Sequence, residues 1–295
     1  MRLPLSLARA LVFLISRPIG PPLPVRFQRL WLEAMSTGGV LPTGTTAERV
    51  QLGGRPAERI VPAGADHSRA VLLLHGGAFV IGSPRTHRVL AAHLAAAVGA
   101  PVSVLHYRRA PEHPWPAAVD DAAAAYRELS GRVPTAVVGD SAGGGLALML
   151  ALRLRNAGAA VPPALALVSP ATDLTLRSSD AYDGRDVVVR RSWLRQGVRA
   201  FVGTGDAADL SPLNADLAGL PPVLVQVAGG ERLEAEGVAL AERLRDAGVD
   251  VELEVLPRVW HDVHLLAHLL PEAAGALERI GGWLAQRLSA APDPA

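Results

Sequence analysis

The segment of this chain that most constrains its fold is the pentapeptide Gly139-Asp140-Ser141-Ala142-Gly143. Residues 135–138 before it read as a short buried strand, and residues 146–155 after it read as an apolar helix. A Gly-x-Ser-x-Gly sequence between a strand and a helix is typical of a turn so tight that the serine backbone is strained and its hydroxyl is exposed. A Cβ at Gly139 or Gly143 would collide with the neighbouring strand or helix. The pentapeptide alone also occurs by chance, so the rest of the chain has to support this interpretation.

The length and composition fit one large α/β domain. The 295 residues are 49% apolar and 19% charged, which is typical of a globular protein with a sizeable core. A formal net charge of +1, without a long basic run, gives no drive toward nucleic acid or an anionic membrane. The chain has no cysteine, which excludes disulfides, thiolate nucleophiles and cysteine-ligated metals.

The N-terminal segment has some features of a signal peptide, with an apolar stretch over residues 3–15. Pro4 and Arg9 interrupt that stretch, no small-x-small cleavage site follows, and a bilayer-spanning helix needs about 20 apolar residues. Four apolar residues recur at helical spacing: Leu7, Leu11, Leu14 and Ile15. The spacing predicts an amphipathic helix lying on the protein, and we expect a cytoplasmic protein without stable membrane insertion.

Strand and helix patterns alternate from about residue 48, which predicts a mostly parallel sheet with helices on both faces. We expect strands over residues 71–74, 101–105, 135–138, 165–168, 223–227 and 251–256. We expect helices over residues 87–98, 117–129, 146–155, 237–247 and 272–288. Two stretches break this rhythm, and segments of such length usually form lids. The predicted division is N-terminal cap helices 1–45, core 46–173, a cap insertion 174–211 with a helix at 192–202, and core 212–295.

A serine hydroxyl becomes a nucleophile only beside a base that a carboxylate supports. In sheets of this type the chain order is serine, acid, histidine. Glu231 is the first carboxylate after the strand 223–227, whereas Glu234 and Glu236 are better placed as charges at a helix start. His261 is the first imidazole after the strand 251–256. These positions predict that Ser141, Glu231 and His261 meet at the carboxyl ends of the strands.

Two further histidines, His264 and His268, follow His261 and could suggest a metal site. No His-Glu-x-x-His motif accompanies them, and no carboxylate falls at a matching offset. We therefore expect no metal, and we interpret both histidines as surface or packing residues.

A glycine-containing turn, His75-Gly76-Gly77-Ala78-Phe79, follows the strand 71–74. Glycines let a backbone approach a substrate closely and present N–H groups to a developing oxyanion. The residue after the nucleophile supplies one such donor. The predicted oxyanion hole therefore consists of the N–H groups of Gly76, Gly77 and Ala142.

Together these motifs resemble the hormone-sensitive-lipase family of α/β-hydrolases, in its bacterial carboxylesterase branch. The resemblance covers nearly the whole chain and includes Tyr107–Ala118, whose sequence YRRAPEHPWPAA is similar to the family's YRLAPEHPFPAA. The family pattern matches Ser141, Glu231 and His261 as nucleophile, acid and base. The chain departs from it in having Ala78 for the third glycine, Glu for the commoner Asp as acid, and Arg109 for an apolar residue. We expect the Arg and Glu of the Tyr107–Ala118 segment to form buried ion pairs.

The resemblance implies a serine carboxylesterase that hydrolyses short- to medium-chain esters without a cofactor. Its partner would be a small ester substrate rather than nucleic acid, and it could form a homodimer through the sheet edge. An amidase or deacetylase with the same triad is the enzymatic alternative, and a non-catalytic receptor on this scaffold is a second class. The candidate substrate-binding residues in and near the cap are Phe79, Trp193 and Phe201, with Leu7, Leu11 and Trp31 as further lining candidates.

Overall fold

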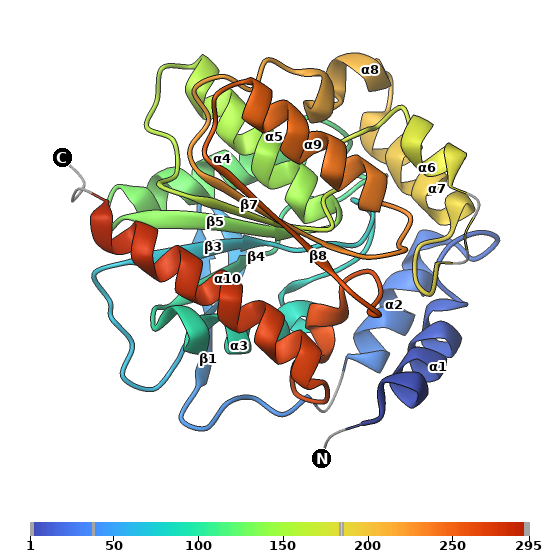
Figure 1. The fold of residues 1–295 in the computed structure, drawn as a ribbon, viewed down its shortest axis with the longest axis horizontal. Helices are drawn as coiled ribbons and strands as arrows, with labels where there is room; N and C mark the ends of the chain where they lie inside the picture. The colour runs from blue at the N-terminus through green and yellow to red at the C-terminus, as the bar shows by residue number, and fades with distance from the viewer. Residues whose placement is uncertain (1–2, 37–38, 183, 185, 292–295) are drawn as a thin grey trace.

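The computed structural model describes residues 3–36, 39–182, 184 and 186–291, and every structural statement below concerns these residues. Their centre is an eight-stranded sheet in the order β1-β2-β4-β3-β5-β6-β7-β8 (Figure 1). The strands are β1 (Thr46–Leu52), β2 (Arg55–Val61), β3 (Ala70–Leu74), β4 (Val102–Leu105), β5 (Thr135–Asp140), β6 (Leu165–Val168), β7 (Val223–Ala228) and β8 (Val251–Leu256). The six strands β3 to β8 are parallel, as the alternating pattern predicts.

The hairpin of β1 and β2 was not among the predicted strands. The two strands pair antiparallel with each other, and β2 pairs antiparallel with β4. Most of β1 is exposed and its sequence is rich in polar residues, so it lacks the apolar run by which buried strands are recognised. Gly53 and Gly54 form the turn, both with positive φ, which glycine adopts without strain.

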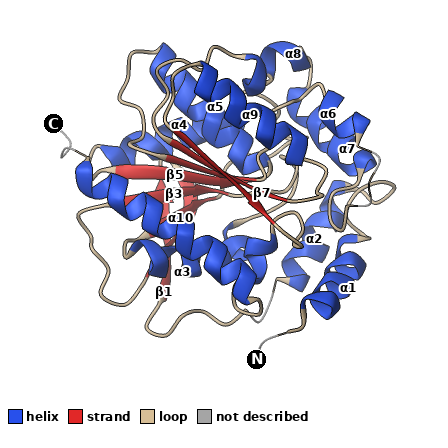
Figure 2. Ribbon diagram, viewed as in Figure 1, coloured by secondary structure: helices blue, strands red, loops and turns tan. Residues whose placement is uncertain are grey.

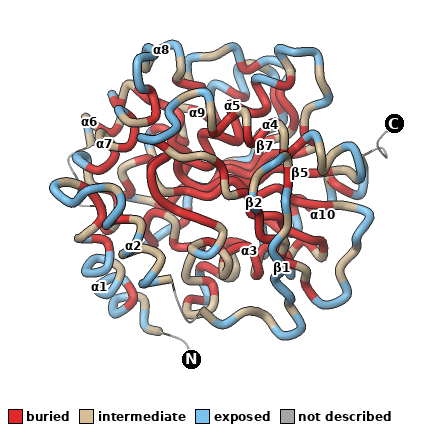
Figure 3. The backbone as a smooth tube through the Cα atoms, turned by 180° about the vertical axis from the view of Figure 1, so that it is seen from behind, coloured by how far each residue is buried: buried red, intermediate tan, exposed pale blue. Residues whose placement is uncertain are grey.

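Helices cover both faces of the sheet (Figure 2). They are α1 (Leu5–Ser16), α2 (Val25–Met35), α3 (Pro84–Val98), α4 (Ala117–Ser130), α5 (Ala142–Asn156), α6 (Arg177–Ala181), α7 (Arg191–Val202), α8 (Ala207–Leu210), α9 (Glu234–Asp246), α10 (Pro271–Ala290) and the 3-10 helices η1 (Pro212–Asn214) and η2 (Val263–Leu266). Successive strand residues point to opposite faces, so Val71 and Leu73 pack with α3 and α10. Leu72 and Leu74 pack with α4, α5 and α9 on the other face. The buried strands between these layers form the centre of the molecule (Figure 3).

The helices α1, α2, α6 and α7, here called the cap helices, lie together at one end of the molecule (Figure 1). Hydrogen bonds join the N-terminal pair to the segment between β6 and β7. Ser16 Oγ donates to Val187 O at 3.0 Å, and Gln28 Nε2 donates to Gln196 Oε1 at 3.0 Å. Two segments far apart in the sequence thus form one structure beside the carboxyl ends of the strands.

Helix α1 is present, but it packs on the protein through a different face from the predicted one. Ala8 and Ser16 are buried, whereas Leu7, Leu11 and Leu14 are exposed. The helix is apolar on nearly every side, so spacing alone did not identify the side that contacts the protein. None of the described helices is long and apolar enough to cross a bilayer.

Candidate active site

Ser141 lies in the tight turn between β5 and α5 and has strained backbone angles, φ 51° and ψ −119°. The two flanking glycines are required as the sequence predicts. A Cβ on Gly139 would run into the backbone of Gly143, and a Cβ on Gly143 would run into the carbonyl of Leu74 at the end of β3. The Ser141 N–H donates to Val168 O at 2.8 Å, which ties the turn to β6. The turn therefore holds the serine hydroxyl at the carboxyl edge of the sheet.

The structure brings Ser141, His261 and Glu231 into one hydrogen-bonded chain. His261 Nε2 lies 2.9 Å from Ser141 Oγ, and His261 Nδ1 lies 2.6 Å from Glu231 Oε2. All three side chains are buried. They come from the loops that follow β5, β7 and β8, because the carboxyl ends of parallel strands meet at one edge.

The neighbouring carboxylates are committed to other contacts. Glu234 Oε2 accepts a hydrogen bond from the N–H of Gly230 at 2.6 Å. Glu236 is buried and accepts a hydrogen bond from the N–H of Asp173 at 2.6 Å.

The second oxygen of Glu231, Oε1, accepts hydrogen bonds from Ser169 Oγ at 2.6 Å and from the N–H of Ala228 at 3.0 Å. These bonds fix Glu231 with one oxygen on the imidazole. Ser169 was not singled out by the sequence, because no motif precedes it.

Asp262 adds a second carboxylate to the site. Its Oδ2 lies 3.1 Å from His261 Nε2, on the same nitrogen that faces Ser141, and its Oδ1 is buried without a hydrogen-bond partner among the described residues. Burial lowers the pKa of His261, but the charges of Asp262 and Glu231 outweigh it and raise that pKa well above its usual value. Burial also raises the pKa of Asp262 to about 6.

The loop after β3 differs in one respect from the predicted oxyanion hole. The N–H of Gly76 donates to Asp140 Oδ2 at 3.0 Å. This N–H is therefore used in a buried hydrogen bond and does not point at the place where an oxyanion would form. The N–H groups of Gly77, Ala78 and Ala142 have no partner within the described ranges. Ala78 has φ 50°, a conformation that favours glycine. Ala78, in the position of the third glycine, is therefore a better candidate donor than Gly76.

Asp140 holds the glycine loop after β3 in place. The same Oδ2 that accepts the Gly76 N–H lies 3.0 Å from His87 Nε2. Burial lowers the pKa of His87, but the Asp140 charge outweighs it and raises that pKa. A Cβ on Gly76 would run into the Asp140 carboxylate. The residue before Ser141 thus anchors the glycine loop, a role that the sequence motif alone did not indicate.

A cavity of about 340 Å³ lies beside these groups. It is lined by Gly76, Gly77 and His261, by Trp193, and by side chains of α1 and α2 that include Val12, Leu32 and Met35. Trp193 lines it as predicted. Phe79 and Phe201 do not, because their rings stack on each other in the core with centroids 4.0 Å apart. Leu7 and Leu11 are also absent from the lining, since they face outward.

The Tyr107–Ala118 segment buttresses the site rather than reaching it. The Tyr107 hydroxyl donates to His75 O at 2.7 Å, and Arg108 forms a salt bridge with the buried Asp121 at 2.7 Å. Arg109 donates to the carbonyl of Gly82 in the loop after the glycine turn. The expected ion pair of Glu112 exists, with Arg29, but Glu112 is exposed rather than buried.

The two other histidines of the C-terminal segment lie in different surroundings. His268 is half-buried and lines the cavity. His264 is buried, and its Nε2 lies 2.9 Å from Gln226 Oε1. Burial lowers the pKa of His264 to about 4, so the ring is neutral at ordinary pH. In the part of the chain that the structure describes, no group of three His, Asp or Glu side chains is arranged to hold a metal ion.

Comparison with known proteins agrees with this geometry. Residues 71–265 match the family described as alpha/beta hydrolase fold. The chain is 41% identical to an acetyl-hydrolase of Streptomyces hygroscopicus over 85% of each chain. It is 38% identical to the carboxylesterase NlhH of Mycobacterium tuberculosis over 74% of this chain and 73% of that protein. Among solved structures, an esterase from the bacterial hormone-sensitive lipase family is 38% identical, with a TM-score of 0.90 over 98% of this chain and all of that one.

The chain therefore belongs to the α/β-hydrolase family, in its bacterial hormone-sensitive-lipase branch. These relatives are named as an acetyl-hydrolase, a carboxylesterase and an esterase, and this chain is a carboxylic ester hydrolase.

Proposed function

We propose that the chain is a serine carboxylesterase in which Ser141, His261 and Glu231 act as nucleophile, general base and supporting acid. The observation that carries the proposal is the unbroken chain of hydrogen bonds from Ser141 Oγ through the imidazole to Glu231. That arrangement lies at the strained turn of a fold shared with esterases. Neither feature requires a cofactor, because the chemistry of acyl transfer is supplied by the three side chains.

The reaction begins with proton transfer from Ser141 Oγ to His261 Nε2 as Oγ attacks the ester carbonyl carbon. Glu231 holds the imidazole by Nδ1 and stabilises the imidazolium. The carbonyl oxygen becomes an oxyanion that the N–H groups of Gly77, Ala78 and Ala142 can receive, together with the positive end of α5. His261 then gives its proton to the departing alcohol. Water repeats the sequence on the acyl-enzyme and releases the acid.

The size of the cavity favours short- to medium-chain acyl groups. Its volume of about 340 Å³ is near the lower end of ligand sites, which run from about 300 to 1,000 Å³. Its lining is largely apolar, with Trp193, Leu32 and Met35 among the contributors. The Nε1 of Trp193 is buried with no partner in the described chain, so the ring presents both an apolar surface and one free donor.

The test is hydrolysis of p-nitrophenyl esters from acetate to laurate by the wild-type protein and by Ser141→Ala. We expect turnover to peak at a short or medium chain and to fall by roughly a thousandfold or more in the variant. A variant with near-normal turnover would refute the assignment of Ser141. Matched ester and amide substrates measured together decide between an esterase and an amidase.

The choice of acid has a matched control within the same loop. Glu231→Ala should lower kcat strongly, although less than Ser141→Ala, because the imidazole loses its support but the nucleophile remains. Glu234→Ala removes a carboxylate three residues away that accepts the backbone N–H of Gly230. If Glu234→Ala had the larger effect, Glu231 would be the wrong acid. Trp193→Ala should shift the preferred acyl chain toward greater length, since it enlarges the cavity.

A further inference from the structure

The outer surface of α1 and α2 carries several exposed apolar side chains. Leu7, Leu11 and Leu14 lie on one side of α1 and are exposed, Leu14 by 64%. Leu23, Phe27 and Leu30 lie on one side of the following turn and α2, and Leu30 is 66% exposed. Trp31 Nε1 donates to Ile15 O at 2.8 Å, which joins the two helices side by side. Soluble monomers seldom expose a large apolar patch unless something covers it, so a group of six exposed apolar side chains on two neighbouring helices calls for an explanation.

Charge is distributed very unevenly in this chain, and the apolar patch lies at the positive end. Residues 1–32 and 190–199 together contain nine arginines and no acidic residue. The rest of the chain holds the other 20 arginines and all 28 acidic residues. The net charge of +1 is therefore the sum of a positive charge on these two segments and a negative charge on the rest of the chain. Such a distribution orients a protein with its positive end toward an anionic surface.

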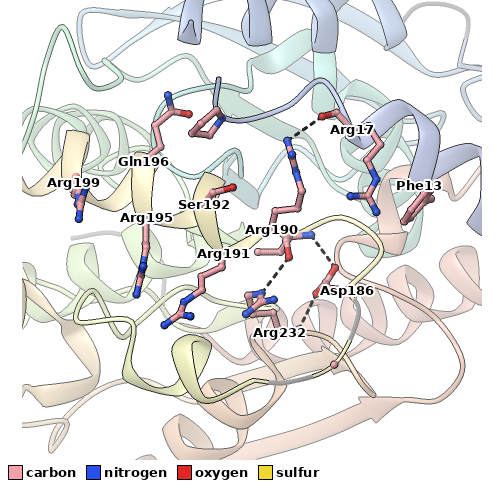
Figure 4. A pocket seen from close by; sticks show the side chains of 13 residues that line it. Phe13, Arg17, Asp186, Arg190, Arg191, Ser192, Arg195, Gln196, Arg199 and Arg232 are labelled. Carbon is pink, nitrogen blue, oxygen red and sulfur yellow. Dashed lines mark hydrogen bonds between the residues drawn. The ribbon is translucent and has the colours of Figure 1, made fainter. Parts of the chain in front are cut away.

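Beside α1, arginines surround a hollow of about 1090 Å³ (Figure 4). They come from the C-cap of α1, from α7 and its N-cap, and from the loop after β7: Arg17, Arg190, Arg191, Arg195, Arg199 and Arg232. Asp180 neutralises part of this charge by pairing with Arg191 and Arg195, and Asp186 also lines the hollow. Arg190 and Arg232 donate to backbone carbonyls. The Nε of Arg190 is buried without a partner in the described residues. Phe13 of α1 and Arg17, the residue directly after α1, both line the hollow, so the apolar patch and the basic hollow adjoin.

We propose that α1 and α2 dock reversibly on the surface of an anionic lipid bilayer. The six apolar side chains Leu7, Leu11, Leu14, Leu23, Phe27 and Leu30, here called the docking face, would enter the boundary between headgroups and acyl chains. Arg9 and Arg26 would contact lipid phosphates, together with Arg17 and Arg199 of the hollow. An apolar helix face bordered by arginine is the pattern by which helices lie in a lipid interface. None of the described helices is suited to span the bilayer, so docking is peripheral.

Docking has a consequence for the active site, and this part rests on the proposed function. The cavity is lined by Val12, Ile15 and Ser16 of α1, the helix whose outer side carries the docking face. A docked protein would hold the cavity close to the lipid, so that esters dissolved in the bilayer could enter without crossing water.

The test is flotation with vesicles of phosphatidylcholine, either pure or mixed with phosphatidylglycerol. The Ser141→Ala protein is used so that no lipid is hydrolysed, which keeps binding separate from catalysis. We expect binding to the mixed vesicles, little binding to pure phosphatidylcholine, and loss of binding at high salt. Leu11→Ser with Leu14→Ser, and separately Arg9→Gln with Arg26→Gln, should each weaken binding by roughly tenfold or more.

The matched control is Val255→Ser with Arg245→Gln, which changes an exposed apolar residue of β8 and an exposed arginine of α9. It should bind vesicles like the parent. With Ser141 restored, the docking-face variants should hydrolyse dissolved p-nitrophenyl butyrate at the wild-type rate, which shows that they are folded.

Three outcomes would overturn the proposal: no binding to mixed vesicles, binding to both vesicle types that neither pair of substitutions weakens, or a dimer in sedimentation that Leu11→Ser with Leu14→Ser dissociates. In the last case the docking face would be an interface between copies of this chain. Loss of activity in Ser141→Ala tests the proposed function and is independent of all three.

Discussion

Asp262 sets the pH at which His261 can act as a base, and Asp262→Asn tests this directly. His261 must be neutral to accept the proton of Ser141 Oγ. The carboxylate of Asp262, with Oδ2 3.1 Å from His261 Nε2, favours the protonated imidazole and so opposes activity at low pH. Glu231 favours the protonated imidazole in the same way from the other ring nitrogen, and the nearby carboxylate of Asp140 is paired with His87. Removing the charge of Asp262 should therefore lower the pKa of His261.

The size of the effect follows from the distance. Two unit charges centred about 4 Å apart interact by about 4 kcal/mol at an effective dielectric constant of about 20. At about 1.4 kcal/mol per unit, this corresponds to about three pKa units. Burial raises the pKa of Asp262 itself to about 6, so near that pH it carries only part of a charge. We therefore expect the pKa of His261 to fall by between about one and three units in Asp262→Asn.

The assay is the pH dependence of kcat/KM on a dissolved ester. Wild-type activity should fall on the acid side with an apparent pKa above the ordinary histidine value, and Asp262→Asn should move this limb to lower pH. Asn suits the site, because Asp262 has φ 53° and Asn tolerates this conformation. Asp262→Glu, which keeps the charge, is the control and should move the limb much less. An acid limb that stays in place or moves upward in Asp262→Asn would refute the reasoning.

Two further predictions concern stability. Burial raises the pKa of Glu236 from 4.5 to about 7. The protonated carboxyl therefore stabilises the fold fully below pH 4.5, and this stabilisation is lost as the pH rises through about 7. The free energy of unfolding should fall by about 3 kcal/mol over this range. Urea unfolding at pH 5 and pH 8 should show that Glu236→Gln removes this loss, and an equal pH dependence in both proteins would contradict it. Phe201→Ala should lower the free energy of unfolding by about 3–5 kcal/mol because it breaks the stack with Phe79. Phe201→Leu should leave the acyl-chain profile unchanged, and a changed profile would place Phe201 at the substrate.

The sequence predicted the elements whose residues carry strong local signals. The strand before Ser141 is a short run of apolar residues, and the two glycines around Ser141 are required by contacts with Gly143 and Leu74. Chain order, together with the positions of Glu231 and His261 directly after two predicted strands, selected this acid and this histidine, which the structure brings together with Ser141. These features depend on neighbours in sequence or on a topology common to parallel sheets.

The features that were missed depend on contacts between distant residues. The Gly76 N–H looked free in the glycine turn, but it is bonded to Asp140, which lies 64 residues away. Phe79 and Phe201 were predicted to bind the substrate from their places in and near the cap, yet their rings pack against each other. The outward side of α1 could not be identified because both sides of this helix are apolar. Asp262 adjoins His261 in sequence, but its effect depends on its position at Nε2.

Asp140 connects two parts of the site that reach it from different strands. Its carboxylate, one residue before Ser141, holds the backbone of Gly76 and the ring of His87. The nucleophile and the glycine loop are therefore built as one part, supplied by β5, the loop after β3 and helix α3. One wall of the cavity comes from other segments, α1, α2 and α7, and these segments contain none of the three residues of the hydrogen-bonded chain. Exchanging the cap between related chains is therefore a route to new substrate ranges that leaves the reacting atoms in place.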